Sequence, residues 1–173
     1  SLGCHLWPGI TKGLVGVKAG PLMAAMDRFD LTIKGKGGHG AMPHLCVDAI
    51  DVACQIVNAL QRIVSRHMNP QNPTVVTVGE IKAGTAFNII PETAYLSGTT
   101  RTFDPEIWKG WADRIDRVVK GICQAMGATY ELNYQSWYPV TVNDPWMAGE
   151  VKEVAGRVVG AENVVVPELT MGG

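Results

Sequence analysis

Between residues 28 and 138, segments whose hydrophobic residues recur at the period of a strand alternate with segments that show the period of a helix. The order of these segments limits the folds open to this chain. Phe29, Leu31 and Ile33 alternate with polar neighbours, which is typical of a half-buried strand. Three more strands are predicted, the first two from their content of Val, Thr and Tyr, at residues 74–82, 93–103 and 129–137.

Two amphipathic helices are predicted between these strands. The first follows Pro43, whose missing N–H costs nothing in the first turn of a helix. Its buried face is expected to comprise Cys46, Ile50, Ala53, Val57, Leu60 and Val64. The second begins at Asp104-Pro105, an N-cap followed by a proline, and ends at Gly127. Its apolar stripe is expected to comprise Trp108, Trp111, Ile115, Val118, Ile122 and Met126.

The predicted order β-α-β-β-α-β is that of the split βαβ, or ferredoxin-like, arrangement. We therefore expect an α+β fold in which two helices cover one face of a four-stranded antiparallel sheet. The two ends of the chain do not belong to this unit. The expected organisation is a central domain at residues 25–139 with partial α/β flanks at 1–24 and 140–173.

The flanks carry weaker patterns. Residues 1–20 are rich in Gly and Pro and predict a strand followed by a connecting loop at 14–17. A second Asp-Pro pair, Asp144-Pro145, predicts a further helix. The apolar face of that helix is expected to comprise Met147, Val151, Val154 and Val158. The run at 164–166 predicts a short buried strand.

Composition excludes several classes of protein. The 173 residues carry 15 Lys and Arg against 16 Asp and Glu, a net charge of −1, whereas nucleic-acid and membrane-surface proteins need a cationic face. No uncharged run approaches the roughly 18 residues of a spanning helix. The four cysteines are too few and too scattered for a disulfide scaffold, and none forms a CxxC pair, which argues against a structural zinc site. We expect a cytoplasmic protein with reduced thiols.

Residues 35–40 match the pattern G-x-G-x-x-G after a strand and before a helix, so a dinucleotide site must be considered. Three features disfavour it: the strand alternates in polarity, Pro43 places the helix after the motif, and the acidic residue expected about twenty positions later is missing. His39 and His44 flank this turn. A histidine framed by glycines, as His39 is, suits a residue that serves a site outside its own domain. The structural alternative is that His39 lies in a mobile surface loop and His44 caps the start of the helix.

Three other polar residues stand out, each with a structural alternative. His5, near the start of the chain, is a candidate metal ligand or a structural histidine. Asn88 lies in the loop between two predicted strands and could bind a ligand or stabilise a turn. Arg101 ends a predicted strand among threonines and could bind a substrate carboxylate or pair with an acidic side chain.

Five segments together resemble a known family. In order, these are GCHLWP at 3–8, GGHGAMPH at 37–44, GTAFNIIP at 84–91, GTTRTF at 98–103 and TMGG at 170–173. They are similar to the hippurate hydrolase and indole-acetyl-amino-acid hydrolase branch of the aminoacylase-type dinuclear metallopeptidases. The resemblance extends over essentially the whole chain.

The resemblance implies an enzyme that hydrolyses N-acyl amino acids with two divalent metal ions (Zn, Mn, Ni or Co), which lower the pKa of a bound water. It also implies a homodimer formed through a ferredoxin-like lid domain. By position, His5 resembles a metal ligand, and His39 resembles the catalytic lid histidine that crosses to the partner's site and stabilises the oxyanion. Asn88 and Arg101 resemble groups that hold the substrate carbonyl or carboxylate.

This chain lacks the family's aspartate segment, Cys-Gly-His segment, paired glutamates and C-terminal histidine. We therefore expect it to be a piece of a longer protein, and expect the piece alone neither to bind the metal pair stably nor to hydrolyse substrate. The thirteen residues from Asn88 to Arg101 would extend close to 40 Å at roughly 3.3 Å per residue. We expect each site to combine Arg101 of one chain with His39 and Asn88 of its partner. The alternative is a stand-alone ferredoxin-like module for dimerisation or small-ligand binding.

Overall fold

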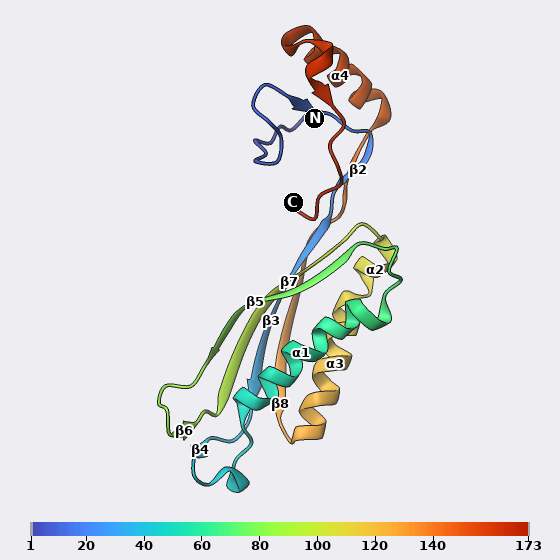
Figure 1. The fold of residues 1–173 in the computed structure, drawn as a ribbon. Coiled ribbons are helices and arrows are strands. Elements are labelled where there is room, and N and C mark those ends of the chain that lie inside the picture. The colour runs from blue at the N-terminus through green and yellow to red at the C-terminus, as the bar shows by residue number, and fades with distance from the viewer. Residues whose placement is uncertain (1, 173) are drawn as a thin grey trace. The chain divides into compact units, whose positions relative to one another are not determined.

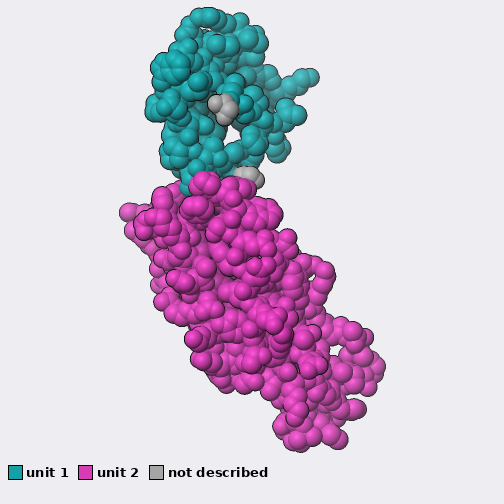
Figure 2. Space-filling model, turned by 180° about the vertical axis from the view of Figure 1, so that it is seen from behind, with its two compact units in different colours: residues 1–24, 140–173 teal, residues 25–139 magenta. Residues whose placement is uncertain are grey.

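The computed structural model describes residues 2–172, which form two compact units. The central unit comprises residues 25–139, and the flanking unit comprises residues 1–24 and 140–173 (Figure 2).

A four-stranded antiparallel sheet forms the centre of the central unit (Figure 1). From edge to edge its strands are β5 (Thr74–Ala83), β7 (Thr93–Thr102), β3 (Ala25–Lys34) and β8 (Thr129–Tyr138). Every neighbouring pair is antiparallel, and β3 pairs with β7 over its full length. The predicted four-stranded antiparallel sheet is confirmed, and its strand bounds differ from the predicted ones by three residues at most.

Two long helices, α1 (Ala49–His67) and α3 (Trp111–Met126), cover one face of this sheet (Figure 1). The alternating residues of β3 point their apolar side chains toward these helices, so the core lies between the two layers. The largest fully buried side chains of this core belong to Trp111, Phe29, Leu31, Ile33, Ile56, Leu60, Leu96 and Ile115.

The first helix begins later than predicted. Pro43–Leu45 form only a 3-10 turn, and α1 starts after Asp48, whose Oδ1 accepts a 2.9 Å hydrogen bond from the Ile50 N–H. The buried face also differs from the predicted one: Ile50 is 39% exposed, Val57 and Val64 are only partly buried, and Cys46 precedes the helix. The residues that α1 buries are Ala49, Val52, Ala53, Ile56, Leu60 and Ile63.

The second predicted helix is divided in two. The short α2 (Pro105–Lys109) ends at Gly110, and α3 follows. The Arg114 side chain fills the space beside Gly110, where a Cβ would lie 2.0 Å from its Nη1, and Nη1 donates to the Ile107 carbonyl at 3.2 Å. This contact satisfies a carbonyl at the end of α2. Trp111 lies in the core as expected, whereas Trp108 is half-buried and makes a polar contact instead.

That polar contact belongs to a buried network centred on Asp27, which is fully buried. Oδ1 of Asp27 accepts hydrogen bonds from the indole Nε1–H of Trp108 at 2.9 Å and from the backbone N–H of Trp137 at 3.1 Å. Oδ2 accepts from the Tyr134 hydroxyl at 2.7 Å, and that hydroxyl lies 2.9 Å from the Thr100 hydroxyl. Burial, together with the hydrogen bond to Asp27, raises the pKa of Tyr134 far above its usual value. The network ties β3, α2, β7 and β8 together at one end of the sheet.

The flanking unit contains two small two-stranded ladders. The strand β1 (Val15–Gly16) pairs with β10 (Val164–Val165) in parallel, and β2 (Gly20–Met23) pairs with β9 (Thr141–Asn143) in an antiparallel manner. The loop predicted at 14–17 is therefore wrong at the residues of β1, and the described residues before β1 contain no strand.

The third predicted helix is present as α4 (Pro145–Val159), and a 3-10 turn, Ala161–Asn163, follows it. Asp144 caps α4 by accepting from the Met147 N–H at 2.9 Å. The expected apolar face is wrong, because no residue of α4 is buried and Val154 and Val158 are 55% and 78% exposed. Among residues 2–172, no helix has the length and apolar character needed to cross a bilayer.

Candidate functional site

A two-residue ladder brings together two of the candidate residues. The short strand β4 (Gly38–His39) pairs antiparallel with β6 (Ile89–Ile90), with His39 opposite Ile89. One more hydrogen bond, 2.8 Å from the Gly40 N–H to the Asn88 carbonyl, extends the ladder. His39 and Asn88 thus lie on adjoining segments, although about fifty residues separate them in the chain.

The glycines of residues 35–40 permit close backbone packing around this ladder. A Cβ at Gly35 would lie 2.2 Å from the Val47 carbonyl oxygen, and a Cβ at Gly38 would lie 2.5 Å from Sγ of Cys46. Since α1 begins only at Ala49, the glycines do not form the N-terminal turn of a helix. Dinucleotide binding by a G-x-G-x-x-G turn needs that turn, so this alternative is wrong.

The His39 side chain is exposed, and its ring is oriented by the backbone. Nδ1 accepts a 3.1 Å hydrogen bond from the Ala41 N–H, and the His39 carbonyl accepts a 2.8 Å bond from the Met42 N–H. The turn therefore fixes both the backbone and the ring of His39. His44 lies in the exposed 3-10 turn and does not cap α1, because Asp48 does.

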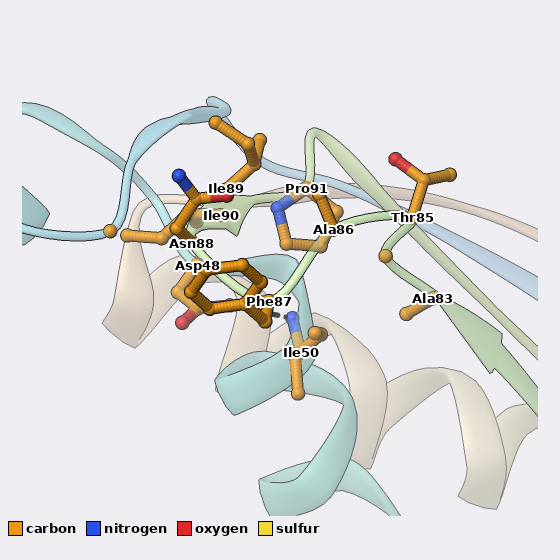
Figure 3. Close-up of a pocket in the computed structure, with 12 residues that line it drawn as sticks. Asp48, Ile50, Ala83, Thr85, Ala86, Phe87, Asn88, Ile89, Ile90 and Pro91 are labelled. Atoms are coloured by element: carbon orange, nitrogen blue, oxygen red, sulfur yellow. Dashed lines mark hydrogen bonds between the residues drawn. The ribbon is translucent and has the colours of Figure 1, made fainter.

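An open hollow of about 520 Å³ lies beside Asn88, between the 84–91 loop and the start of α1 (Figure 3). It is lined by residues 83–91, together with Gly40, Asp48 and Ile50. Phe87 projects fully into solvent. The Asn88 amide can both donate and accept hydrogen bonds, so this loop can hold a carbonyl or an N–H group of a ligand.

Arg101 lies at the other end of the sheet. It pairs with Met26 on β3 and with Val75 on β5. Arg101 is seven positions along β7 from Ala94, and Ala94 pairs with Ala83, the last residue of β5 before the Asn88 loop. Seven steps in a strand span about 23 Å. The structure therefore does not bring Arg101 together with His39 and Asn88 in one protomer. Its Nη1 is buried and has no hydrogen-bond partner among the described residues, and such a donor fits a carboxylate or another anionic group.

His5 lies in the flanking unit, exposed, with its ring edge-on to Trp7 at a centroid distance of 6.5 Å. The Trp7 indole in turn lies against Gly172, where a Cβ would be 2.8 Å from Cη2. The first and last of the five sequence segments are thus in contact within this unit. Cys4 is exposed as well.

A metal site needs several ligating side chains that lie close together. Residues 2–172 contain no group of three or more His, Cys, Asp or Glu side chains placed to hold a metal ion. His5 is a single candidate ligand, and a pair of divalent ions needs several carboxylate and imidazole ligands. The described residues therefore do not form a two-metal site by themselves.

The Asp27 network escaped the sequence analysis, although one signal could have revealed it. Asp27 occupies the same alternating phase as Phe29, Leu31 and Ile33, so its carboxylate had to face the core. A carboxylate in a core position needs several donors.

On the opposite face of the sheet, Asp30 binds Arg28 at 2.9 Å and the Tyr95 hydroxyl at 2.6 Å. Burial alone would raise the pKa of Asp30, but its hydrogen bonds together outweigh burial and lower it.

Comparisons with known proteins identify the central unit. Residues 25–126 match the family model of the peptidase dimerisation domain, M20_dimer. An N-acyl-L-amino acid amidohydrolase of Geobacillus stearothermophilus is 45% identical over 142 residues, which are 82% of this chain and 38% of that protein. An N-acetyl-L-cysteine deacetylase of Bacillus subtilis is 42% identical over 156 residues, 90% of this chain and 38% of that protein.

A solved structure agrees with these matches. The Bacillus subtilis YXEP protein, described as a dinuclear metal binding peptidase from the M20 family, superimposes with a TM-score of 0.71 at 34% identity. The match covers 98% of this chain and 41% of that protein. This chain thus spans less than half the length of the relatives that it matches.

Proposed function

Because the chain belongs to the M20 family of aminoacylase-type amidohydrolases and peptidases, we propose that it is the dimerising lid, with its flanks, of a metal-dependent amidohydrolase. The substrate class is N-acyl amino acids of the hippurate kind. The relatives named as an N-acyl-L-amino acid amidohydrolase and as an N-acetyl-L-cysteine deacetylase support this class. The central unit would be the ferredoxin-like lid, and the flanking unit would be part of the catalytic domain.

The same proposal assigns a homodimer. The dimerisation-domain match supports it, and so does the sheet, in which β5 and β8 are edge strands whose outer backbone groups can pair with another strand. Pairing of two lids along one edge would make a continuous sheet with two-fold symmetry.

The family resemblance suggests a role for each site residue, and their separation suggests which chain supplies it. His39 would stabilise the oxyanion that forms when the amide carbon is attacked, and Asn88 would bind the substrate from the same loop cluster. Arg101 would hold the α-carboxylate through its unpaired, buried guanidinium nitrogen. The observation that supports a shared site is the distance of about 23 Å along β7 from Ala94, beside the Asn88 loop, to Arg101. A small substrate spans far less than this distance. Each site would take Arg101 from one chain and His39 and Asn88 from the partner.

The parent protein would use two divalent ions, which would lower the pKa of a water molecule and polarise the substrate carbonyl. His5 would contribute one ligand. The described residues hold no cluster of metal ligands. That this chain alone does not bind the metal pair stays a prediction. We also propose a cytoplasmic location, which the four free cysteines support.

The test is an assay of the longer protein together with the oligomeric state of this chain. The longer protein should hydrolyse N-acyl amino acids such as hippurate and lose the activity when its metals are chelated. This chain should behave as a dimer in light scattering at micromolar concentration, without turnover. A clean monomer would count against the lid assignment, and turnover by this chain alone would contradict the proposal that the site is incomplete.

A further inference from the structure

The orientation of the His39 ring determines which of its nitrogens can act on a substrate. The Ala41 N–H donates to Nδ1 at 3.1 Å, so Nδ1 provides its lone pair and cannot carry a proton in this arrangement. The proton of the neutral ring must then be on Nε2. We propose that the Ala41 backbone N–H is a positioning group that holds His39 as a neutral Nε2–H donor, which makes this histidine a hydrogen-bond donor and not a general base.

The surrounding turn supports this orientation. The Met42 N–H bonds to the His39 carbonyl and the Gly40 N–H bonds to the Asn88 carbonyl, both at 2.8 Å, so backbone groups on both sides of the ring are fixed. Gly38, which precedes His39, packs against Cys46 and leaves the strand little freedom to shift. The donor to Nδ1 is therefore held in place by contacts that do not depend on a ligand.

A fixed donor suits the chemistry of the proposed function, on which this inference rests. A tetrahedral oxyanion needs a donor directed at the oxygen where the charge develops, and such a donor stabilises it without a net charge on the ring. The hydrogen bond that the Ala41 N–H donates to Nδ1 selects the Nε2–H tautomer. A general base would need a free lone pair, and the only lone pair of this ring is engaged by the Ala41 N–H.

The ring nitrogens of this chain can be observed directly by 15N NMR at a pH where the rings are neutral. His67, exposed at the end of α1, serves as an internal reference with no ring hydrogen bond among the described residues. The ratio of Nε2–H to Nδ1–H should be about fivefold higher for His39 than for His67, the factor expected from one neutral hydrogen bond. An equal ratio, or a predominant Nδ1–H form, would overturn the proposal.

A backbone ester separates the Ala41 contact from the fold of the turn. Replacement of Ala41 by lactate removes its N–H and keeps its side chain, and should return His39 to the ratio of His67. The matched control is the hydroxy-acid analogue of Met42, which removes a hydrogen bond of the same turn but leaves Ala41 intact. That control should keep the His39 ratio. An equal loss of tautomer preference in both esters would assign the preference to the turn and refute a role for Ala41.

Two substitutions in the longer protein test the catalytic consequence. The side-chain NH2 of Gln can occupy the place of Nε2, and that of Asn the place of Nδ1. His39→Gln should therefore retain a kcat at least about tenfold above His39→Asn, as expected for one transition-state donor. Equal activities would refute Nε2 donation. Absence of any amidohydrolase activity in the unaltered protein would refute the proposed function, whereas the tautomer measurement would stand independently.

Discussion

The carbonyl of Asn88 accepts a 2.8 Å hydrogen bond from the Gly40 N–H, which joins the loop of Asn88 to the strand of His39. The two candidate residues are therefore parts of one element built from distant segments, and Arg101 is not part of it. A site that needs all three must draw them from more than one copy of the central unit.

The packing of Gly38 against Cys46 should support the His39 strand. Gly38→Ala places a methyl group 2.5 Å from Sγ, so the free energy of unfolding should fall by about 1–3 kcal/mol. The measurement is urea unfolding of this chain. Cys46→Ala in the same chain should recover most of the loss, because it removes the clashing sulfur.

Gly79→Ala is the matched control for that experiment, since a Cβ there meets no described atom within 4 Å. It should change the unfolding free energy by less than about 1 kcal/mol. A Gly38→Ala variant that is no less stable than Gly79→Ala would show that the contact does not constrain the strand.

Asp27→Asn should strongly destabilise the central unit. The carboxylate of Asp27 accepts from three donors, and an amide nitrogen in its place would face at least one of them. The expected loss is about 2–4 kcal/mol, because buried polar groups lose their partners. The measurement is thermal unfolding followed by circular dichroism.

Asp116→Asn offers a comparison for Asp27→Asn. Asp116 is half-buried and accepts one hydrogen bond from the Tyr130 hydroxyl, which an Asn oxygen can still accept. The unfolding temperature of the Asp116→Asn variant should stay within a few degrees of that of the unaltered chain. If both substitutions lowered the unfolding temperature equally, the Asp27 network would not be a principal support of the fold.

Tyr130 should make the stability sensitive to alkaline pH. The hydrogen bond to Asp116, with burial adding to it, raises the pKa of Tyr130 from 10.0 to about 12. Between these values the unfolded chain loses the phenol proton while the folded chain keeps it, so the free energy of unfolding falls as pH rises. This contribution is fully present below pH 10.

Urea unfolding at several values between pH 9 and pH 12 tests the Tyr130 prediction. Tyr130→Phe has no phenol proton to lose, so its stability should fall less steeply above pH 10 than that of the original chain. Identical slopes for the two chains would contradict the assigned shift.

The strand and helix order was predictable because long elements show their period in the sequence. Phe29, Leu31 and Ile33 mark β3 by alternation, and Trp111 and Ile115 mark the buried face of α3. Element starts were less predictable, since Pro43 and Asp48 are both acceptable beginnings of a helix and only packing selects Asp48.

The candidate residues and the separation of Arg101 from Asn88 could be proposed from the sequence, and the roles of these residues stay predictions. The pairing of the His39 segment with the Asn88 segment could not be foreseen. His39 and Asn88 are drawn together by β4 and β6, and a two-residue strand has no period that a sequence could reveal. The apolar face expected for α4 failed for a different reason. Its valines follow a helical pattern, but the flanking unit provides no surface that buries Val154 or Val158.

Subunit exchange in the longer protein tests the central claim, that two chains share each site, most directly. His39→Ala and Arg101→Ala variants should each be nearly inactive alone. After complete exchange of equal amounts, half of the dimers would be mixed and one of their two sites would be intact, so activity should recover to about a quarter of the original. Activity that stays at the sum of the two inactive variants would contradict the account.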